Sequence, residues 1–505
     1  MPADPTDDVR TLHRLGYAQE LARCLGGFSN FAISLSIICV LAGGLTSFHV
    51  GFCSVGGAAI GLGWPAMCLV SLAVAATMGQ VASAFPTAGG LYHWAAILGG
   101  RGWGWATAWF NLAGLVTVLA AINVGTFRFA AAAFDPDFDP ADPAALQFQF
   151  AVVSAMTASQ ALVNHLGIRV TRVLTDFSGW WILAVSAALT GALLACAPTI
   201  ELGRLVTFTN FSGDAGGGVW PATGALAVLF ALGLLLPAYT ITGFDASAHA
   251  AEETVGAATA VPKGIVRSVL VSGVVGWVML SAVVLAMPDP VAAAALGEKA
   301  FAHTLTAVVP GWLATALFVG AVVAQYLCGL ATVTSASRMA FAFARDGGLP
   351  LSSAVRRVSP RFRTPPVAVW GVSVAAVAFT AFTPVYTTIT AVCVILLYVS
   401  YVVPTVLGFA AHGRSWTAFG PWTLGRWFRP LAVVSVIGCG GLIVIGVQPP
   451  NESALYTVAG MALLLVVGWF ARARGHFPGP PQGVLTAARK AELEAAEAAV
   501  GETPK

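Results

Sequence analysis

Residues 236–245 read Leu-Pro-Ala-Tyr-Thr-Ile-Thr-Gly-Phe-Asp, and they interrupt a long apolar run near the middle of the chain. Pro237 and Gly243 both disfavour a continuous helix. In a bilayer, backbone groups that leave a helix must find other partners, so broken helices occur where the irregular backbone is buried or lines a cavity. The stretch therefore predicts an interrupted membrane helix, with Asp245 as an ionisable group beside the break.

A second interruption is predicted near the start of the chain. Residues 37–45 read Ile-Ile-Cys-Val-Leu-Ala-Gly-Gly-Leu. Gly43 and Gly44 each lower the stability of a helix by about 1 kcal/mol relative to Ala. Taken alone, this pair is more simply explained by close packing between helices. Two interruptions at corresponding places in two halves, however, are typical of a transporter binding site. The N–H groups at half-helix N-termini would suit a carboxylate, as in an amino acid.

The composition excludes an ordinary soluble protein. Of the 505 residues, 57% are hydrophobic and 9% are charged, and the mean hydropathy is +0.82. Because soluble domains carry about 25% charged residues, the solvent must be lipid. Apolar runs of roughly 20 residues predict an all-α integral membrane protein with about 12 transmembrane helices. These runs lie near residues 28–50, 62–84, 103–130, 148–167, 173–196, 223–250, 265–287, 312–343, 366–383, 388–411, 430–447 and 454–471.

The distribution of Lys and Arg predicts the orientation in the membrane. If both termini are cytoplasmic, only Arg128, Arg204 and Lys299 of the 25 Lys and Arg residues fall on the outer side. Cytoplasmic loops are enriched in these residues, so we expect a multi-pass protein of the plasma membrane with cytoplasmic N- and C-termini. Residues 1–27 are then a cytoplasmic N-terminal segment and residues 472–505 a cytoplasmic tail.

Enzyme and metal signatures are missing from the sequence. It has no Gly-Lys-Ser/Thr phosphate loop, no His-Glu-x-x-His and no Gly-x-Ser-x-Gly, so we expect neither enzyme activity nor a cofactor. Asp245, His249, Glu252 and Glu253 follow helical spacing, but no paired His or Cys accompanies them, which disfavours a metal site. We expect the two glutamates near cytoplasmic water. Asp245 is expected at mid-membrane, as a helix cap or a coupling residue.

Four stretches form a specific combination of motifs. Residues 82–94 read Ala-Ser-Ala-Phe-Pro-Thr-Ala-Gly-Gly-Leu-Tyr-His-Trp, and residues 242–249 read Thr-Gly-Phe-Asp-Ala-Ser-Ala-His, followed by Glu-Glu-Thr at 252–254 and Val-Pro-Lys-Gly-Ile at 261–265. Ser-Arg-Met at 337–339 leads to Arg-Asp-Gly-Gly-Leu-Pro at 345–350, and Ala-Gly-Gly stands at 42–44. Together they resemble the amino acid, polyamine and organocation transporter superfamily, and within it the amino acid and choline transporter family of GABA and choline permeases.

The resemblance covers roughly residues 25 to 475 and implies the leucine-transporter fold. In that fold two inverted five-helix repeats are followed by two extra helices. Here the ten-helix core would span residues 28–411, with repeat one at about 28–196 and repeat two at about 223–411. The two additional helices would lie within residues 412–471.

The resemblance also implies a substrate site at the two breaks. Main-chain groups there would hold the carboxylate and amino groups of the substrate, and Tyr239 falls where relatives place an aromatic gate or contact. The implied site residues are Ala42, Gly43, Gly44, Tyr239, Thr240, Thr242, Gly243 and Phe244. We expect Val at position 43 or 243 to abolish binding while leaving folding largely intact.

Three positions depart from the family pattern. Gln80 stands where the family usually has Glu, and an amide cannot take up a proton. Leu115 replaces a frequent polar Gln, and Ile182 falls where some proton-coupled relatives carry Lys. Thr332, Thr334 and Ser335 form a candidate cation site. Their hydroxyl oxygens would suit a hard cation. The coupling ion therefore stays open between H⁺, which the family favours, and Na⁺.

The sequence thus predicts a secondary active transporter that moves amino acids or GABA-like zwitterions by alternating access. Two alternatives remain open. One is a choline or polyamine carrier, although a cation needs acidic or aromatic partners at mid-membrane, and only Asp245 is well placed. The other is a nutrient sensor of the same fold that binds without transport. The expected partners are a small-molecule substrate, the lipid bilayer and a coupling ion, with no nucleic acid.

Overall fold

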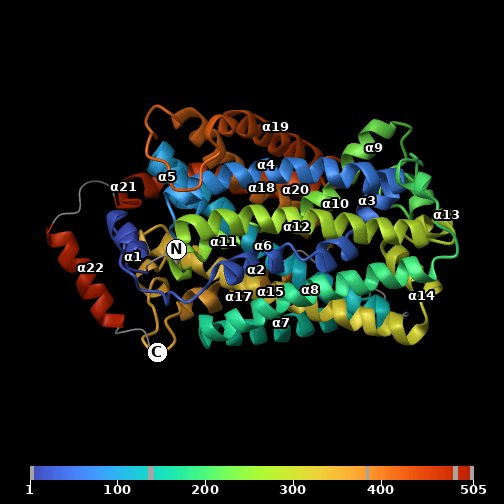
Figure 1. The fold of residues 1–505 in the computed structure, drawn as a ribbon, viewed down its shortest axis with the longest axis horizontal. Coiled ribbons are helices and arrows are strands. Elements are labelled where there is room, and N and C mark those ends of the chain that lie inside the picture. Colours follow the sequence, from blue (N-terminus) through green and yellow to red (C-terminus); the bar gives the residue numbers. More distant parts are fainter. Residues whose placement is uncertain (1–4, 135–141, 383–385, 482–486, 501–505) are drawn as a thin grey trace.

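A computed structural model describes residues 5–134, 142–382, 386–481 and 487–500. Every element of these ranges is helical, and the long helices run side by side along one axis (Figure 1). The N-terminus, the C-terminus, α1 (Pro5–Arg14) and α22 (Ala487–Val500) lie at one end of this bundle, called here the termini end. The opposite end, called the far end, holds α3 (Phe48–Val55), α13 (Pro290–Ala295) and α14 (Ala300–Val308).

The first half of the bundle contains the first five predicted spans. Its long helices are α2 (Gly27–Ile37), α4 (Trp64–Ala84), α6 (Arg101–Phe134), α7 (Pro143–His165) and α8 (Ile168–Cys196). The short α5 (Leu91–Gly99) lies between α4 and α6 in sequence.

The second half contains the remaining spans. They are α9 (Leu226–Gly233) with α10 (Leu235–Thr240) and α11 (Ala246–His249), then α12 (Ala257–Ala286), α15 (Gly311–Arg345), α17 (Pro366–Phe382), α18 (Tyr386–Ala411), α19 (Phe428–Gly446) and α20 (Glu452–Gly468). Two short helices, α16 (Ser352–Val355) and α21 (Arg474–His476), lie toward the termini end.

The apolar helices confirm the expected all-α membrane architecture. In the described ranges, ten helices are long and apolar enough to cross a membrane, and two shorter apolar helices cover Leu226–Thr240 and Pro366–Ala381. The shorter pair corresponds to predicted spans six and nine, so about twelve spans are accounted for. Lipid leaves no water for free backbone groups, and helices satisfy these groups internally.

The helices differ in depth within the bundle. In the apolar stretch of α6, 83% of the residues are buried inside the protein. In that of the last span, Glu452–His476, which contains α20, only 6% are buried. Helices α6 and α15 pack against each other, α6 also packs against α18, and all three are mostly buried, so they belong to the interior. Helices α19 and α20 lie outside this core. The division of the first ten spans into two inverted repeats stays a prediction.

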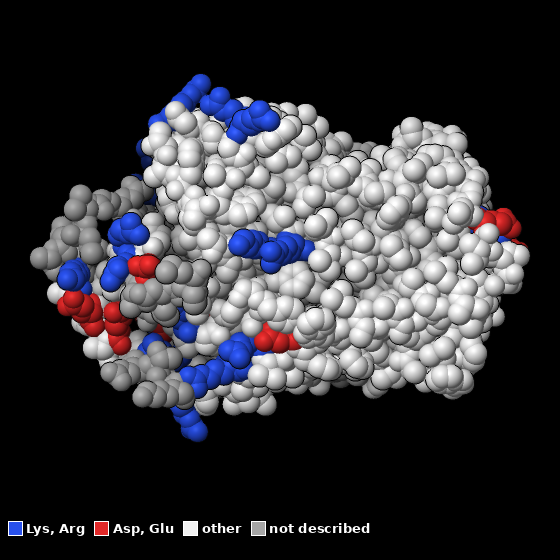
Figure 2. Space-filling view, in the orientation of Figure 1, with Lys and Arg blue, Asp and Glu red and all other residues white. Residues whose placement is uncertain are grey.

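Charged side chains are concentrated toward one end. On the face shown in Figure 2, Lys and Arg gather toward the termini end, and the broad middle of the surface carries few charges. A long uncharged band is the surface that a bilayer requires.

Candidate functional site

Both predicted interruptions are present. Helix α2 ends at Ile37, and after Ile38 and Cys39 the chain continues as a π-helical segment, Val40–Gly44. Here the break lies a few residues before the two glycines, which belong to the π-helical segment. Segments of this kind are frequent at functional sites.

The sixth span breaks between α10 and α11. Residues Ile241 to Asp245 separate these helices, and Gly243 has a φ of 81°, a conformation that favours glycine. Its N–H donates to the hydroxyl of Tyr401 on α18 at 3.0 Å. The unwound backbone is thus held by a side chain of a neighbouring helix.

The two broken helices touch at their breaks. A Cβ added to Gly43 would lie 2.8 Å from the Cα of Thr240, and one added to Gly243 would overlap the side chain of Ile37. Val at either position would therefore push the broken helices apart. The structure changes the expected result of those substitutions, because a loss of binding would come with disrupted packing and would not isolate the carboxylate pocket.

A serine joins the two broken helices on the side of the termini end. The Oγ of Ser34 lies 2.8 Å from the carbonyl oxygen of Phe244 and 2.7 Å from the Oγ of Ser247, and it accepts from the N–H of Ser247 at 2.9 Å. The Oγ of Ser247 also lies 2.9 Å from the carbonyl oxygen of Asn30, so the two hydroxyl hydrogens are shared among these three contacts. These hydrogen bonds hold α2 against α11.

Asp245 is the centre of a buried polar cluster. Its Oδ2 accepts from Nδ2 of Asn111 on α6 at 2.9 Å and lies 3.2 Å from Nε2 of His249, and its Oδ1 accepts from the Tyr401 hydroxyl at 2.8 Å. We call these four residues the Asp245 cluster. Asp245 directly precedes α11, yet its side chain makes no capping hydrogen bond to that helix.

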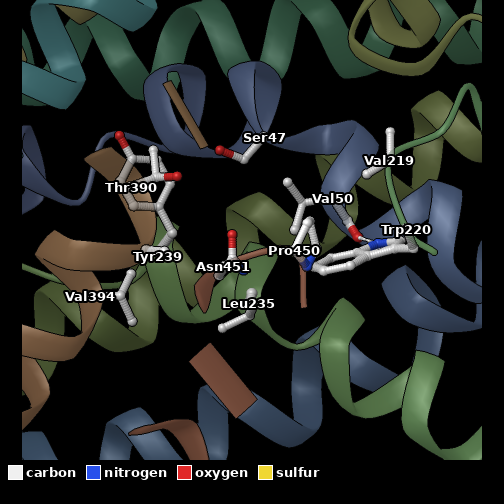
Figure 3. A pocket seen from close by; sticks show the side chains of 11 residues that line it. Ser47, Val50, Val219, Trp220, Leu235, Tyr239, Thr390, Val394, Pro450 and Asn451 are labelled. Atoms are coloured by element: carbon white, nitrogen blue, oxygen red, sulfur yellow. Dashed lines mark hydrogen bonds between the residues drawn. The ribbon is translucent and has the colours of Figure 1, made fainter. Parts of the chain in front are cut away.

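A narrow cavity of about 50 Å³ lies on the far side of the breaks (Figure 3). Its lining includes Tyr239 on α10, Ser47, Thr390 on α18, and Asn451. The cavity admits water but is much smaller than the usual ligand pocket of about 300–1,000 Å³. Tyr239 is the one implied substrate residue in its lining, whereas the other implied residues are buried beneath it or beside the breaks.

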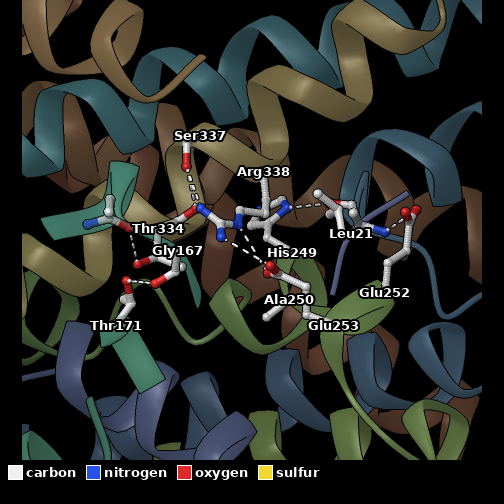
Figure 4. Close-up of polar contacts among 12 residues, drawn as sticks. Leu21, Gly167, Thr171, His249, Ala250, Glu252, Glu253, Thr334, Ser337 and Arg338 are labelled. Atoms are coloured by element: carbon white, nitrogen blue, oxygen red, sulfur yellow. Dashed lines mark hydrogen bonds and ion pairs between the residues drawn. The ribbon is translucent and has the colours of Figure 1, made fainter. Parts of the chain in front are cut away.

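The termini end is closed by two buried ion pairs. Glu253 accepts from Nε and Nη2 of Arg338, both at 3.0 Å, and Glu252 accepts from Nη1 and Nη2 of Arg345 at 3.0 and 2.8 Å. Figure 4 shows the Arg338 guanidinium between Ser337 and Glu253. We call these two contacts the arginine pairs.

The arginine pairs correct the expected surroundings of the glutamates. Both were expected near cytoplasmic water, but each is 0% exposed. The N-terminal segment covers them: the N–H groups of Cys24 and Leu25 donate to the carbonyl of Glu253, and Nε2 of Gln19 donates to the carbonyl of Glu252. The sequence pattern did not reveal that residues before the first span would fold over this end.

A third buried carboxylate at this end, Asp346, adds to the closure. Its Oδ2 accepts from the hydroxyls of Tyr17 and Tyr92, both at 2.8 Å, and lies 3.0 Å from Nε2 of His93. Burial raises the pKa of this carboxyl, but His93, Arg345 and Tyr17 outweigh burial and hold the pKa below its usual range. Burial and Asp346 raise the pKa of the Tyr17 hydroxyl well above its usual value, so Tyr17 remains a donor.

The hydroxyls of the candidate cation site have varied surroundings. Thr332 Oγ1 donates to the carbonyl of Cys328, and Thr334 Oγ1 donates to Oδ1 of Asn164 and to the carbonyl of Leu330. Ser335 Oγ is buried without a hydrogen-bond partner. The role of these hydroxyls as ion ligands stays a prediction. No group of three or more His, Cys, Asp or Glu placed to hold a metal ion occurs among the residues that the structure describes.

The three departures from the family pattern lie inside the protein. Gln80 is fully buried, and its Oε1 accepts from the N–H of Leu424 at 2.8 Å. Leu115 and Ile182 are buried and apolar. All three therefore have packing or bonding roles in this structure.

Sequence reasoning gave no role to several residues that bind the breaks or the buried carboxylates. They are Tyr17, Ser34, Tyr92, His93, Asn111, Arg338, Arg345 and Tyr401. A polar or charged residue within an apolar helix is a general signal of function. It could have singled out Asn111 and Arg338, but the sequence gives no sign of which carboxylate each one meets.

The comparisons with known proteins agree with this architecture. The profile of the family described as amino acid permease matches residues 25–471. The chain is 31% identical to amino-acid permease BAT1 of Arabidopsis thaliana, with 96% of this chain and 98% of that protein covered. It is also 31% identical to the BAT1 homolog of Oryza sativa subsp. japonica, with 93% and 94% covered, and 28% identical to an uncharacterized amino-acid permease of Schizosaccharomyces pombe, with 98% and 91% covered.

The fold and the broken-helix site define a multi-pass membrane permease. The chain belongs to the amino acid permease family.

Proposed function

We propose that this protein is a secondary active transporter that moves amino acids or GABA-like zwitterions by alternating access. The observation that carries the proposal is the contact of two interrupted helices in the interior, at Gly43 and Thr240, below a narrow cavity lined by Tyr239. Its family relatives, which are named amino-acid permeases, support the same substrate class.

In this proposal the substrate binds between the breaks. The main chain of Ala42, Gly43 and Gly44 and the unwound residues after Tyr239 supply the groups for the carboxylate and the amine. Ala42 and Gly43 donate their N–H groups to the carbonyl of Cys39 at 2.8 and 3.0 Å in this state. These two N–H groups must leave the Cys39 carbonyl before they can bind a substrate. The segment Val40–Gly44 would therefore rearrange when the substrate enters, as a gate does.

The closed contacts support an outward-oriented state. The arginine pairs and the Asp346 contacts close the termini end, while the cavity near Tyr239 lies toward the far end. Because Lys and Arg gather at the termini end, we infer that this end faces the cytoplasm. We further propose that the membrane is the plasma membrane. Transport would then proceed by opening the arginine-paired end as the far end closes.

The Asp245 cluster weighs against a choline or polyamine carrier. A bound cation would need a carboxylate with a free face. Both oxygens of Asp245 already accept hydrogen bonds from residues of the protein. A zwitterion that uses main-chain groups does not require this carboxylate as a direct ligand.

An uptake screen in proteoliposomes tests the proposal. Purified protein is supplied with labelled GABA, alanine, choline or putrescine, and counterflow is measured after loading the vesicles with the unlabelled compound. We expect counterflow with an amino acid or GABA and none with choline or putrescine. Counterflow only with a cationic amine would replace the proposed substrate class, and binding without counterflow would indicate a sensor.

Tyr239→Ala is the matched site variant, and Tyr456→Ala is its control. Tyr456 is 74% exposed on α20. We expect the Tyr239 variant to lose at least about tenfold in uptake at low substrate concentration, and the Tyr456 variant to transport normally. Equal uptake by both variants would remove Tyr239 from the substrate path.

A further inference from the structure

His249 has an acceptor at each of its ring nitrogens. Its Nδ1 lies 3.1 Å from the carbonyl oxygen of Ala88, and its Nε2 lies 3.2 Å from Oδ2 of Asp245. A carbonyl oxygen only accepts, so Nδ1 must carry a hydrogen. A neutral imidazole has one N–H, and Nε2 would then turn a lone pair toward the carboxylate.

The contact between His249 and Asp245 is therefore attractive only if the pair holds one more proton. The proton lies on Nε2, which gives an imidazolium beside a carboxylate, or on Oδ2, which gives a neutral imidazole beside a carboxylic acid. In both forms the net charge of the pair is zero. Without that proton the pair carries a net charge of −1, at residues that are each 0% exposed. An uncompensated buried charge is strongly unfavourable.

The neighbouring side chains do not replace this proton. Asn111 and Tyr401 donate hydrogen bonds to Asp245 but carry no positive charge. Helix α2, which packs against α11, has no titratable side chain.

Other neighbours of α11 carry titratable groups, most of them already engaged. Helix α12 carries Lys263 and Arg267, which are both exposed. Helix α15 carries Tyr326, Cys328, Arg338 and Arg345. The turn after α11 carries Glu252 and Glu253. The arginines of α15 form the arginine pairs with those two glutamates, and His93, next to the loop that contacts His249, is bonded to Asp346. A mobile proton is thus the charge that balances Asp245.

We propose that Asp245 and His249 together form the binding site of the coupling proton. The inference rests on the proposed transport function, and it favours H⁺ as the ion that drives transport. Proton uptake forms an N–H bond at Nε2 of His249 or an O–H bond at Oδ2 of Asp245. Proton release breaks that bond and delivers the proton to water.

Ala88 connects this site to the closure of the termini end. Its carbonyl accepts from Nδ1 of His249, and its N–H donates to Oε1 of Glu252 at 3.0 Å, while Glu252 is paired with Arg345. Separating Glu252 from Arg345 would free this loop to move. His249 would lose the acceptor of its Nδ1 hydrogen as water enters, so the proton is released when the termini end opens.

The first test measures proton-driven transport in proteoliposomes with labelled GABA and labelled alanine. The variants are His249→Gln, whose amide can still donate to Asp245 but cannot titrate, and Asp245→Asn; the exposed His303→Gln on α14 is the control. With the outside about one pH unit more acidic, one proton per substrate supports about tenfold accumulation. We expect wild type and His303→Gln to accumulate substrate and to acidify the vesicle interior, as read by a trapped pH dye.

His249→Gln and Asp245→Asn are expected to show no accumulation and no acidification. His249→Gln should lose more in accumulation than in counterflow, because exchange moves no net proton, whereas the exposed His303→Gln should exchange substrate at the wild-type rate. Accumulation by His249→Gln at the wild-type level would overturn the proposal. So would net substrate uptake by wild type without acidification of the vesicle interior, and in that case the transport function itself would stand.

The second test needs no substrate and so separates the two proposals. The ¹⁵N spectrum of histidine-labelled protein is titrated between pH 5 and 8, and the His249 signal is assigned by its absence in His249→Gln. We expect Nε2 either to carry the proton or to accept it from Oδ2 of Asp245, and in both forms the Nε2 signal should shift in Asp245→Asn. An Nε2 signal that is the same in wild type and Asp245→Asn throughout the titration would refute the site even if transport were established.

Discussion

The Asp245 cluster and the arginine pairs are both built on buried carboxylates, but their partners differ in kind. Glu252 and Glu253 meet arginines, whose charge is permanent. Asp245 meets an amide, a phenol and a histidine, and none of these three side chains carries a permanent charge. The difference indicates that the arginine pairs are opened only by separating charges, whereas the Asp245 cluster can change its charge in place.

Removal of one arginine should have the largest effect. Arg338→Gln leaves Glu253 buried without its cation, and we expect a loss of about 3–5 kcal/mol in stability. Thermal unfolding of the purified protein in detergent measures this loss, with the exposed Arg414→Gln as the control.

A double variant sharpens the interpretation. Adding Glu253→Gln to Arg338→Gln removes both charges and should restore more than half of the lost stability. If the single variant unfolds like wild type, Arg338 and Glu253 are not a closing contact.

The second prediction concerns Cys24, whose N–H donates to the carbonyl of Glu253. Burial, with the nearby charge of Glu253, raises the pKa of the Cys24 thiol to about 11. The thiolate is the reactive form, so alkylation at pH 8 should be about a hundredfold slower than that of an unperturbed thiol.

The rate of alkylation should rise about tenfold per pH unit until the pH approaches that pKa. A maleimide reagent measures it in a variant in which Cys68 and Cys196, the other half-buried cysteines, are replaced by Ser. Adding Arg338→Gln should speed the reaction by loosening the cover over the thiol, and this gain should exceed the loss of a cation that lowers the pKa of Cys24. A rate at pH 8 equal to that of glutathione would mean that the N-terminal segment does not cover this end.

Tyr401→Phe tests the Asp245 cluster without removing a charge. The substitution leaves the Gly243 N–H unpaired and takes one donor from Asp245. The loss of a buried partner costs about 1–3 kcal/mol, and we expect initial uptake to fall about tenfold. Tyr398→Phe is the matched control, because its hydroxyl makes only contacts of 3.4 Å. Equal rates in both variants would separate Tyr401 from the transport cycle.

The smallest effect is expected at the serine between the broken helices. Ser34→Ala removes its contacts to Phe244 and Ser247 and should cost about 1 kcal/mol of stability. Ser36→Ala is the control, since Ser36 Oγ is buried on the same helix without a hydrogen-bond partner. Comparing the thermal unfolding of the two variants measures the contribution of the Ser34 contacts. A larger loss in Ser36→Ala would contradict this assignment.

The sequence by itself determined the architecture of this protein and the approximate positions of its breaks. Apolar runs long enough to cross a bilayer must be helical, because lipid offers no partner to a free backbone group. Pro237 and Gly243 then show where a helix cannot continue, and the motif at 82–94 indicates the family. These features are local, so each can be inferred without knowing what lies beside it.

Only the tertiary structure decided which groups meet at the buried carboxylates. Asn111 and Tyr401 lie 134 and 156 residues from Asp245 in sequence, yet they bond to its two oxygens. Glu252 and Glu253 resemble residues at an aqueous helix end until Arg345 and Arg338 of a distant helix are placed against them. The charge state and accessibility of a carboxylate depend on its surroundings in space, and helix packing alone brings those surroundings together.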